Sequence, residues 1–263
     1  MERHDDISAN DATANGEPVG CDMTRLQARI QDLQGLWPVE ECIADHADVL
    51  EYRLRLSGEE LDRSNRETIR TLIRIAAYRD DESGAHVKRI GLYAAHLAQR
   101  MGLDREYCGT ILLASQLHDI GKIGISERIL EKPGPLNRDE WRVMKAHAAL
   151  GAKMLAHNSS PYLVMAADIA RAHHERWNGS GYPDGLRGEA IPLASRITGL
   201  CDIYDTLRSP RPYKLAVDHA RAASAILAGD GKTRPEYFDP AVLDAFESSL
   251  AMFRDIFDTL ADQ

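Results

Sequence analysis

The sequence predicts an all-α protein. Apolar residues recur at three- and four-residue intervals from residue 22 almost to the C-terminus, and no stretch alternates between apolar and polar residues as a strand does. Residues able to bind metals recur at intervals of about two helices, as expected when each helix of an antiparallel bundle presents one residue inward. With 263 residues, the chain can hold one large domain, or one domain with an appended segment.

The first 62 residues divide into two segments. Residues 1–21 are polar and short of large apolar side chains, which predicts a disordered tail. Residues 22–62 predict a helical connector whose apolar residues follow alternating four- and three-residue steps: Ile43, Ala47, Leu50, Leu54 and Leu61. This seam indicates a homodimer. The alternative is a helix packed on its own domain, and Gly58, which weakens the seam, keeps that alternative open.

Residues 63–263 predict one helical domain. Amphipathic patterns indicate helices over residues 104–118, 138–156, 162–174, 193–207, 217–228 and 240–260. Asn137 and Glu140 have the spacing of a capping box at the start of one of them. Two long segments, 119–136 and 175–191, lack a helical pattern and are rich in Gly and Pro. We expect both to be functional loops, because long loops are uncommon in compact domains.

Seven residues of this domain are good metal ligands. Two adjacent pairs, His118-Asp119 and His173-His174, accompany the single residues His86, His147 and Asp202, and Glu82 is a possible eighth ligand. Each such group costs several kcal/mol, as a rough estimate, when it is buried without a partner, and a bound metal offsets that cost. A His/Asp/Glu set without thiolate suits Fe, Mn or Zn. The set is too large for one ion and predicts at least a binuclear centre, the usual arrangement for hydrolysing phosphate esters.

Composition limits the other functions. A formal net charge of −9 argues against binding of nucleic acid polymers, which requires a basic surface. The four cysteines show no C-x-x-C spacing, and no apolar run is long enough to span a bilayer. We therefore expect a cytoplasmic protein without a membrane segment. The net charge is compatible with a small anionic ligand, because a local cluster of cations or metal ions can hold one inside an acidic protein.

A longer motif surrounds the second ligand pair. Residues 173–186 are HHERWNGSGYPDGL, and further matching segments follow at residues 188–197, 202–207 and 211–214. With His86, His118-Asp119 and Asp202, the chain resembles the HD superfamily of metal-dependent phosphohydrolases. The motif around Gly181-Tyr182-Pro183 is similar to that of the HD-GYP subfamily. The likeness runs from about Glu82 to about Asp244, and it implies an HD-type helical bundle.

The resemblance implies an enzyme that hydrolyses cyclic di-GMP to the linear dinucleotide, to GMP or to both. It implies two or three divalent metal ions, with iron or manganese expected, and the ligands His86, His118, Asp119, His147, His173, His174 and Asp202. Glu82 matches an additional carboxylate of trinuclear members. The alternative for Glu82 is an acidic residue in the first turn of a helix, favoured by the helix dipole.

Three residues near these ligands have expected roles in the chemistry. Asp119 is the expected bridging carboxylate. Lys122 is expected to hold a phosphate oxygen or to protonate the leaving 3′-oxygen, unless it only complements the end of a helix. Asp205 is expected either to anchor Lys122 or to orient a ligand histidine.

Three further residues are expected to contact the substrate. The resemblance implies that Arg211 and Lys214 grip a phosphate of the substrate, with a solvated loop as the alternative. Tyr182 is expected either to stack on a guanine or to fill space between loops.

Two other functions are alternatives to hydrolysis of cyclic di-GMP. One is a non-catalytic receptor or adaptor that binds the dinucleotide or a diguanylate cyclase, and the complete ligand set argues against it. The other is an HD hydrolase for a different cyclic dinucleotide, and the long motif argues against that. The segment before residue 63 is too short for a receiver domain, so regulation is expected through residues 22–62 or a partner protein.

Overall fold

The computed structural model describes residues 23–36, 39–79, 84–210 and 216–260. Its residues form two compact units, with the boundary between Glu59 and Glu60. The predicted disordered tail and three of the predicted site residues, Glu82, Arg211 and Lys214, lie outside the described residues.

The first unit consists of α1 (Met23–Leu36) and the N-terminal half of α2 (Val39–Arg79), a helix of 41 residues that crosses the unit boundary. Gly58 does not interrupt α2, because one glycine costs only about 1 kcal/mol in a helix interior. Three residues of the predicted seam are largely exposed: Leu50 at 55%, Leu54 at 74% and Leu61 at 64%.

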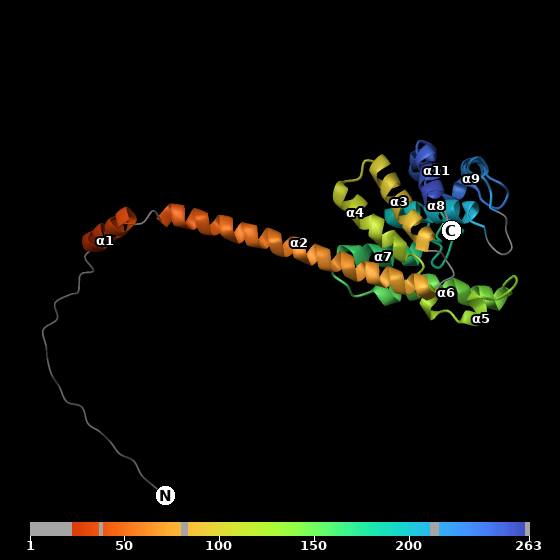
Figure 1. The fold of residues 1–263 in the computed structure, drawn as a ribbon, viewed down its shortest axis with the longest axis horizontal. Helices are drawn as coiled ribbons and strands as arrows, with labels where there is room; N and C mark the ends of the chain where they lie inside the picture. The colour runs from red at the N-terminus through yellow and green to blue at the C-terminus, as the bar shows by residue number, and fades with distance from the viewer. Residues whose placement is uncertain (1–22, 37–38, 80–83, 211–215, 261–263) are drawn as a thin grey trace, which may run out of the picture. The chain divides into compact units, whose positions relative to one another are not determined.

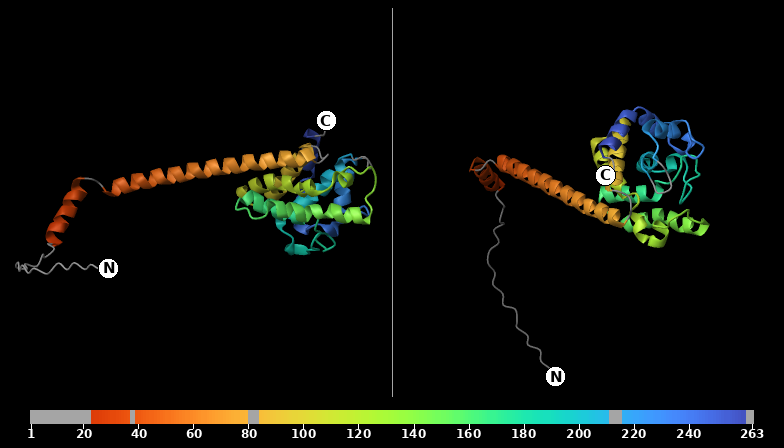
Figure 2. Two further views of the ribbon diagram at one scale, coloured as in Figure 1. Left: turned by 90° about the horizontal axis from the view of Figure 1, so that it is seen from below. Right: turned by 45° about the vertical axis from the view of Figure 1, so that its right-hand side comes forward.

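The second unit is a helical bundle (Figures 1 and 2). Its central helices are α3 (Gly84–Arg100), α4 (Arg105–Ala114), α6 (Arg138–Leu155), α7 (Pro161–Ala172) and α8 (Leu193–Arg208). Helix α3 packs on α4 and α8, and α7 packs on α4, α6 and α8. Three further helices, α9 (His219–Leu227), α10 (Pro240–Glu247) and α11 (Leu250–Thr259), belong to the same unit, as does α2 from residue 60 onward. Of these, α10 and α11 contact α3, and α9 contacts α8.

Local sequence explains where several helices begin. Asp104 and Asp218 cap α4 and α9 by accepting hydrogen bonds from backbone N–H groups of the first turn. The predicted capping box of Asn137 and Glu140 is confirmed at the start of α6. The predicted all-α class is confirmed, and the described residues contain no strand.

Several predicted boundaries were wrong. The segment 119–136 contains a 3₁₀ helix, η2 (Ile120–Gly124), and one turn of helix, α5 (Glu127–Leu130). Segment 175–191 contains η3 (Gly188–Ala190), and the predicted helix 104–118 changes after Ala114 into η1 (Ser115–Leu117). These elements are too short for an apolar period to be recognised in the sequence.

The segment 240–260, predicted as one helix, forms two helices. The helix is interrupted between α10 and α11 at Ser248 and Ser249. The hydroxyl groups of these residues donate hydrogen bonds to the Ala245 carbonyl at 2.9 and 2.7 Å. Such local side-chain bonds compete with the regular helical pattern.

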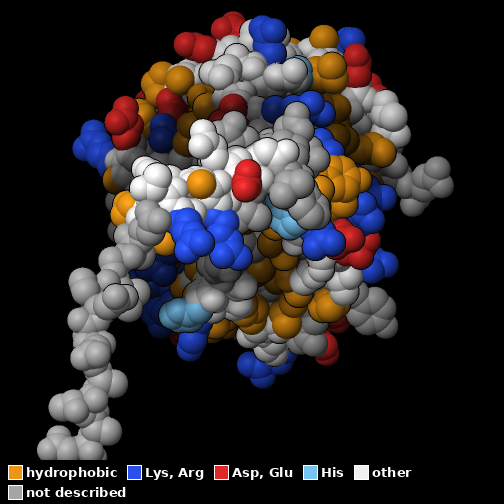
Figure 3. Space-filling model, turned by 90° about the vertical axis from the view of Figure 1, so that its left-hand side faces the viewer, with side chains coloured by type: hydrophobic (Ala, Val, Ile, Leu, Met, Phe, Trp, Pro, Cys, Tyr) orange, Lys and Arg blue, Asp and Glu red, His pale blue; other side chains and the backbone are white. Residues whose placement is uncertain are grey.

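The surface carries charges of both signs. On the face drawn in Figure 3, Lys and Arg side chains are interspersed with acidic and hydrophobic ones. Within the described ranges, none of the helices is both long and apolar enough to cross a bilayer.

Candidate metal centre

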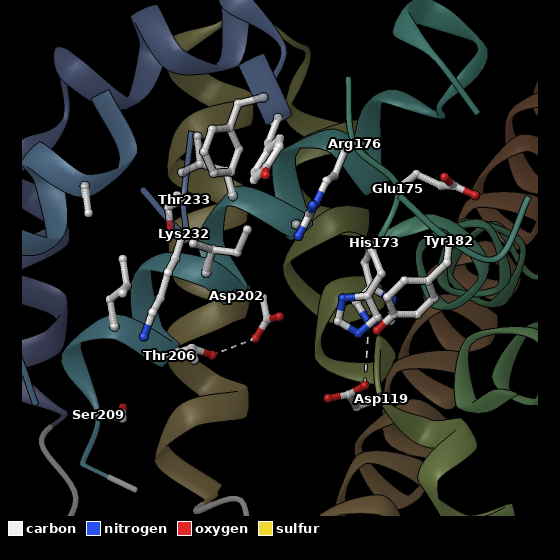
Figure 4. Close-up of a pocket in the computed structure, with 18 of the residues that line it drawn as sticks. Asp119, His173, Glu175, Arg176, Tyr182, Asp202, Thr206, Ser209, Lys232 and Thr233 are labelled. Atoms are coloured by element: carbon white, nitrogen blue, oxygen red, sulfur yellow. Dashed lines mark hydrogen bonds and ion pairs between the residues drawn. The ribbon is translucent and has the colours of Figure 1, made fainter. Parts of the chain in front are cut away.

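The bundle gathers the seven predicted ligands that the structure describes. His86 lies in the first turn of α3, His147 on α6, and Asp202 on α8. The adjacent pairs occupy helix ends: His118-Asp119 lies between η1 and η2, and His173-His174 directly follows α7. All except His118, which is buried, line one cavity of about 1670 Å³ (Figure 4).

The ligands form two groups, each with its donor atoms within 4.8 Å of one another. Asp119, His147, His173 and His174 form one group, and His86, His118 and Asp202 form the other. Asp119 reaches both groups, because its Oδ1 lies 3.1 Å from His147 Nε2 and its Oδ2 lies 3.3 Å from His118 Nε2. A carboxylate in this position can bridge two metal ions.

Hydrogen bonds orient the imidazoles toward the centre. The Nδ1 atoms of His118, His147 and His173 lie between 2.7 and 3.1 Å from carbonyl oxygens of the preceding helical turn. A carbonyl only accepts, so each Nδ1 donates, and each ring in its neutral form presents the Nε2 lone pair to the centre. The Nε2 of His118 is buried without a hydrogen-bond partner among the described residues. This donor set fits divalent metal ions.

Charge and burial oppose each other at the His118-Asp119 pair. Burial by itself lowers the pKa of His118, but the Asp119 carboxylate outweighs burial and raises the pKa to about 9. Burial likewise raises the pKa of Asp119, whereas Lys122 and His118 together hold it well below its usual range. Asp119 is therefore ionised near neutral pH, as a metal ligand requires.

The second histidine pair favours the neutral state. Burial lowers the pKa of His173, and burial together with the neighbouring His173 ring lowers that of His174 well below its usual range. Neutral imidazole is the form that binds a metal ion.

Asp205 lies behind His86 rather than at the cavity. Its Oδ2 lies 2.8 Å from His86 Nδ1, and its carboxylate accepts two hydrogen bonds from Arg89 at 2.7 and 2.8 Å. Lys122 pairs instead with Asp119, at 2.9 Å from Oδ2. Of the two roles expected for Asp205, this geometry matches the orientation of a histidine. Sequence reasoning missed Arg89, although it lies three residues after His86, on the same side of α3.

The loop after α7 is built around Glu175 and Gly181. Glu175 Oε1 accepts hydrogen bonds from the backbone N–H groups of Asp184 and Gly185 at 2.7 and 3.0 Å. A Cβ atom on Gly181 would lie 2.4 Å from Arg176 N, so only glycine fits there. The Gly-Tyr-Pro segment thus belongs to a loop held against the residues that follow α7, where Tyr182 N–H donates to the His174 carbonyl at 3.3 Å.

Tyr182 lies beside the ligands. Its ring centroid is 4.7 Å from that of His174, and Lys145 Nζ lies 5.4 Å from the Tyr182 ring centroid. Burial, followed by the charges of Asp119 and Asp202, raises the pKa of Tyr182, so its hydroxyl remains protonated at neutral pH. The side chain both packs the loop and lines the cavity, where its hydroxyl can donate a hydrogen bond.

A family model described as the HD domain matches residues 70–242, well over half of the chain. The chain belongs to the HD domain family. The family predicted from the sequence motifs is therefore confirmed, and HD domains are associated with binding of divalent metals.

Relatives of known name extend this comparison. The chain is 40% identical over 231 residues to the cyclic di-GMP phosphodiesterase response regulator RpfG of Xanthomonas campestris, covering 88% of this HD protein and 60% of that relative. It is 36% identical over 185 residues to the 3′3′-cGAMP-specific phosphodiesterase 2 of Vibrio cholerae, covering 70% of this chain and 35% of that protein. The chain thus spans only part of the relatives it matches.

A solved structure supports the fold. The cyclic GMP-AMP-specific phosphodiesterase V-cGAP3 of V. cholerae superimposes with a TM-score of 0.52 at 19% identity, covering 74% of this chain and 51% of that one. This likeness agrees with the predicted HD-type helical bundle.

Proposed function

We propose that this HD protein is a metal-dependent phosphodiesterase that hydrolyses cyclic di-GMP to the linear dinucleotide, to GMP or to both. The observation that carries the proposal is the position of Asp119 between two groups of metal-binding side chains at the wall of a large cavity. The relatives named as cyclic di-GMP phosphodiesterases support this choice of substrate.

The chemistry divides between the metal ions and the side chains. Bound divalent ions supply Lewis acidity, which neutralises the phosphodiester and acidifies an attacking water. We infer two ions, or three if Glu82 adds a ligand, with iron or manganese favoured by the mixture of imidazole and carboxylate. Asp119 bridges the two ligand groups, and Asp205 keeps His86 in the orientation that presents Nε2 to the centre.

Lys122 lines the cavity beside Asp119 and can act as a proton donor there. Its ammonium group lies 2.9 Å from Asp119 Oδ2 and is only 15% exposed. From that position it can hold a phosphate oxygen or give a proton to the leaving 3′-oxygen. Tyr182, with its protonated hydroxyl, can donate a hydrogen bond to the same substrate.

Turnover of cyclic di-GMP by the metal-loaded chain tests the proposal. We expect chromatography to resolve the linear dinucleotide or GMP as product, and we expect cyclic GMP-AMP to be hydrolysed more slowly in a parallel assay. Asp119→Asn and His118→Ala should each abolish turnover and lower the metal content. His219→Ala is a matched control, because His219 binds Tyr204 and lies outside both ligand groups. Full turnover by Asp119→Asn with normal metal content would rule out this assignment of the site.

Several expectations from the sequence remain predictions. One is that Arg211 and Lys214 grip a phosphate of the substrate, and another is that a diguanylate cyclase or regulatory protein is a partner. The homodimer and the cytoplasmic location are also predictions.

A further inference from the structure

Arg176 enters the cavity from the loop after α7. It lines the same cavity as Asp119, His173 and Asp202. Figure 4 shows its side chain running inward, with the guanidinium between the side of the cavity that carries Asp202 and the side that carries His173. The position was not among the site residues expected from the sequence.

The protein holds this guanidinium in a defined orientation. Arg176 Cζ lies 3.9 Å from the centroid of the Tyr237 ring, so one face of the planar group is stacked on an aromatic ring. The backbone keeps the two segments together, because Trp177 N–H donates to the Tyr237 carbonyl at 2.8 Å. Stacking covers a face of the guanidinium but leaves its N–H edge available.

Four carboxylates that line the cavity have partners other than Arg176. Glu175 Oε1 accepts from the loop amides, Asp239 pairs with Arg196, and Asp119 pairs with Lys122. Asp202 Oδ1 accepts a hydrogen bond from Thr206 at 3.5 Å and lies 3.9 Å from His86 Nε2. Among the described residues, no acceptor takes a hydrogen bond from the Arg176 guanidinium. A half-buried cation with unused donors beside a metal centre indicates an anionic ligand, because without one its charge would only be repelled by the bound metal ions.

We propose that Arg176 binds the non-bridging oxygens of the phosphodiester held at the metal centre. This rests on the proposed function and adds a substrate-binding residue to it. The planar fork of arginine matches two phosphate oxygens through parallel hydrogen bonds. Negative charge on those oxygens persists in the transition state of phosphoryl transfer, where an arginine contributes to its stabilisation.

Binding of inorganic phosphate to the metal-loaded full chain tests the contact without any need for turnover. Calorimetry should show at least about tenfold weaker binding for Arg176→Gln than for the unaltered protein, as expected for loss of a charge-assisted hydrogen bond. Arg187→Gln is the matched control, because Arg187 lies on the same loop, is exposed and does not line the cavity. Metal content and thermal unfolding of both variants should match those of the parent protein.

Turnover of two substrates then separates phosphate from base recognition. Arg176→Gln should slow hydrolysis of cyclic di-GMP and of bis(p-nitrophenyl) phosphate, which has no nucleobase, by similar factors. Added guanidinium ion should restore part of the activity of Arg176→Gln, whereas ammonium ion should not. Arg176→Lys, which keeps the charge but loses the fork, should be intermediate.

Different results would contradict the role of Arg176 in phosphate binding and the proposed hydrolysis of cyclic di-GMP. Unchanged phosphate affinity in Arg176→Gln makes the residue a solvated cation. A defect confined to cyclic di-GMP makes it a base contact, and loss of metal from the variant makes it a structural residue. A parent protein that leaves cyclic di-GMP intact, yet binds phosphate through Arg176, contradicts the proposed substrate and retains the phosphate contact.

Discussion

Arg89 and Asp205 form a buried ion pair that supports His86 from behind. Arg89 Nε donates to Asp205 Oδ1 at 2.7 Å, and both side chains are fully buried. The other carboxylate oxygen lies 2.8 Å from His86 Nδ1. Arg89 also donates to the Leu260 carbonyl at 2.7 Å, next to the end of α11. The C-terminal helix, the ion pair and the metal-facing histidine are therefore connected through direct contacts.

Breaking this pair should reduce both stability and metal affinity. Arg89→Met leaves the Asp205 carboxylate buried without its cation, so we expect the free energy of unfolding to fall by about 3–5 kcal/mol. Metal affinity should fall by about 10- to 100-fold, because Arg89 no longer holds the Asp205 carboxylate in the position from which it orients His86. Denaturant unfolding and metal titration measure the two effects.

A double variant separates them. Arg89→Met with Asp205→Leu removes both charges, so most of the lost stability should return. The affinity for metal should remain low, because His86 Nδ1 then lacks an acceptor. Recovery of full metal affinity in the double variant would show that Asp205 does not act through His86.

Metal binding should depend on pH through His118. The pKa of about 9 means that, in the metal-free protein at neutral pH, His118 carries a proton on the nitrogen that faces the centre. A metal ion must displace that proton, so affinity should fall as the pH decreases from about 9, by up to about tenfold per pH unit. Calorimetry in two buffers of different ionisation enthalpy should detect proton release near pH 7. Heats independent of the buffer would contradict this pKa.

Lys122→Met should lower kcat while leaving the metal content intact, because Lys122 contacts Asp119 and is not itself a ligand. If Lys122 protonates the leaving 3′-oxygen, the loss should be about 10²- to 10⁴-fold for cyclic di-GMP. It should be much smaller for a p-nitrophenyl ester, whose leaving group needs no proton. Equal losses for the two substrates would indicate instead that Lys122 holds a phosphate oxygen.

Glu82→Gln tests the number of metal ions. If Glu82 is a ligand of a third ion, metal analysis should show the ratio of metal to protein falling from three to two, with the binuclear centre retained. Glu67→Gln, at an exposed position on α2, serves as the control for loss of a carboxylate. A ratio of two in both the parent and Glu82→Gln would make Glu82 an acidic residue of a helical first turn.

The exposed apolar residues of α2 predict a homodimer. Leu50 and Leu54 are more than half exposed and lie four residues apart, as in the seam of a coiled coil. Light scattering of the full chain at roughly tens of micromolar should give the mass of a dimer. The double variant Leu50→Glu with Leu54→Glu should give the mass of a monomer. A monomeric parent protein would mean that this helix packs within its own chain.

The amino-acid sequence alone determined the features that depend on neighbouring residues. The apolar period predicted the all-α class, the types of the residues in His118-Asp119 and His173-His174 predicted a metal centre, and the long Gly-Tyr-Pro motif predicted the family. The capping box of Asn137 and Glu140 was also predictable, because its hydrogen bonds join residues three positions apart. The breaks at Ala114 and Ser249 were missed, because a break of one or two residues barely disturbs the period.

Only the tertiary structure decided how the site is assembled. The contact between Arg89 and Asp205 joins residues 116 positions apart, and no local pattern indicates which acid a buried arginine will meet. The pairing of Lys122 with Asp119 rather than Asp205 and the stacking of Arg176 on Tyr237 have the same origin. Such contacts depend on the angles and distances at which whole helices pack, and these angles and distances are determined jointly by many side chains that are far apart in the sequence. Helix periodicity and helix caps, in contrast, depend on residues within a single turn.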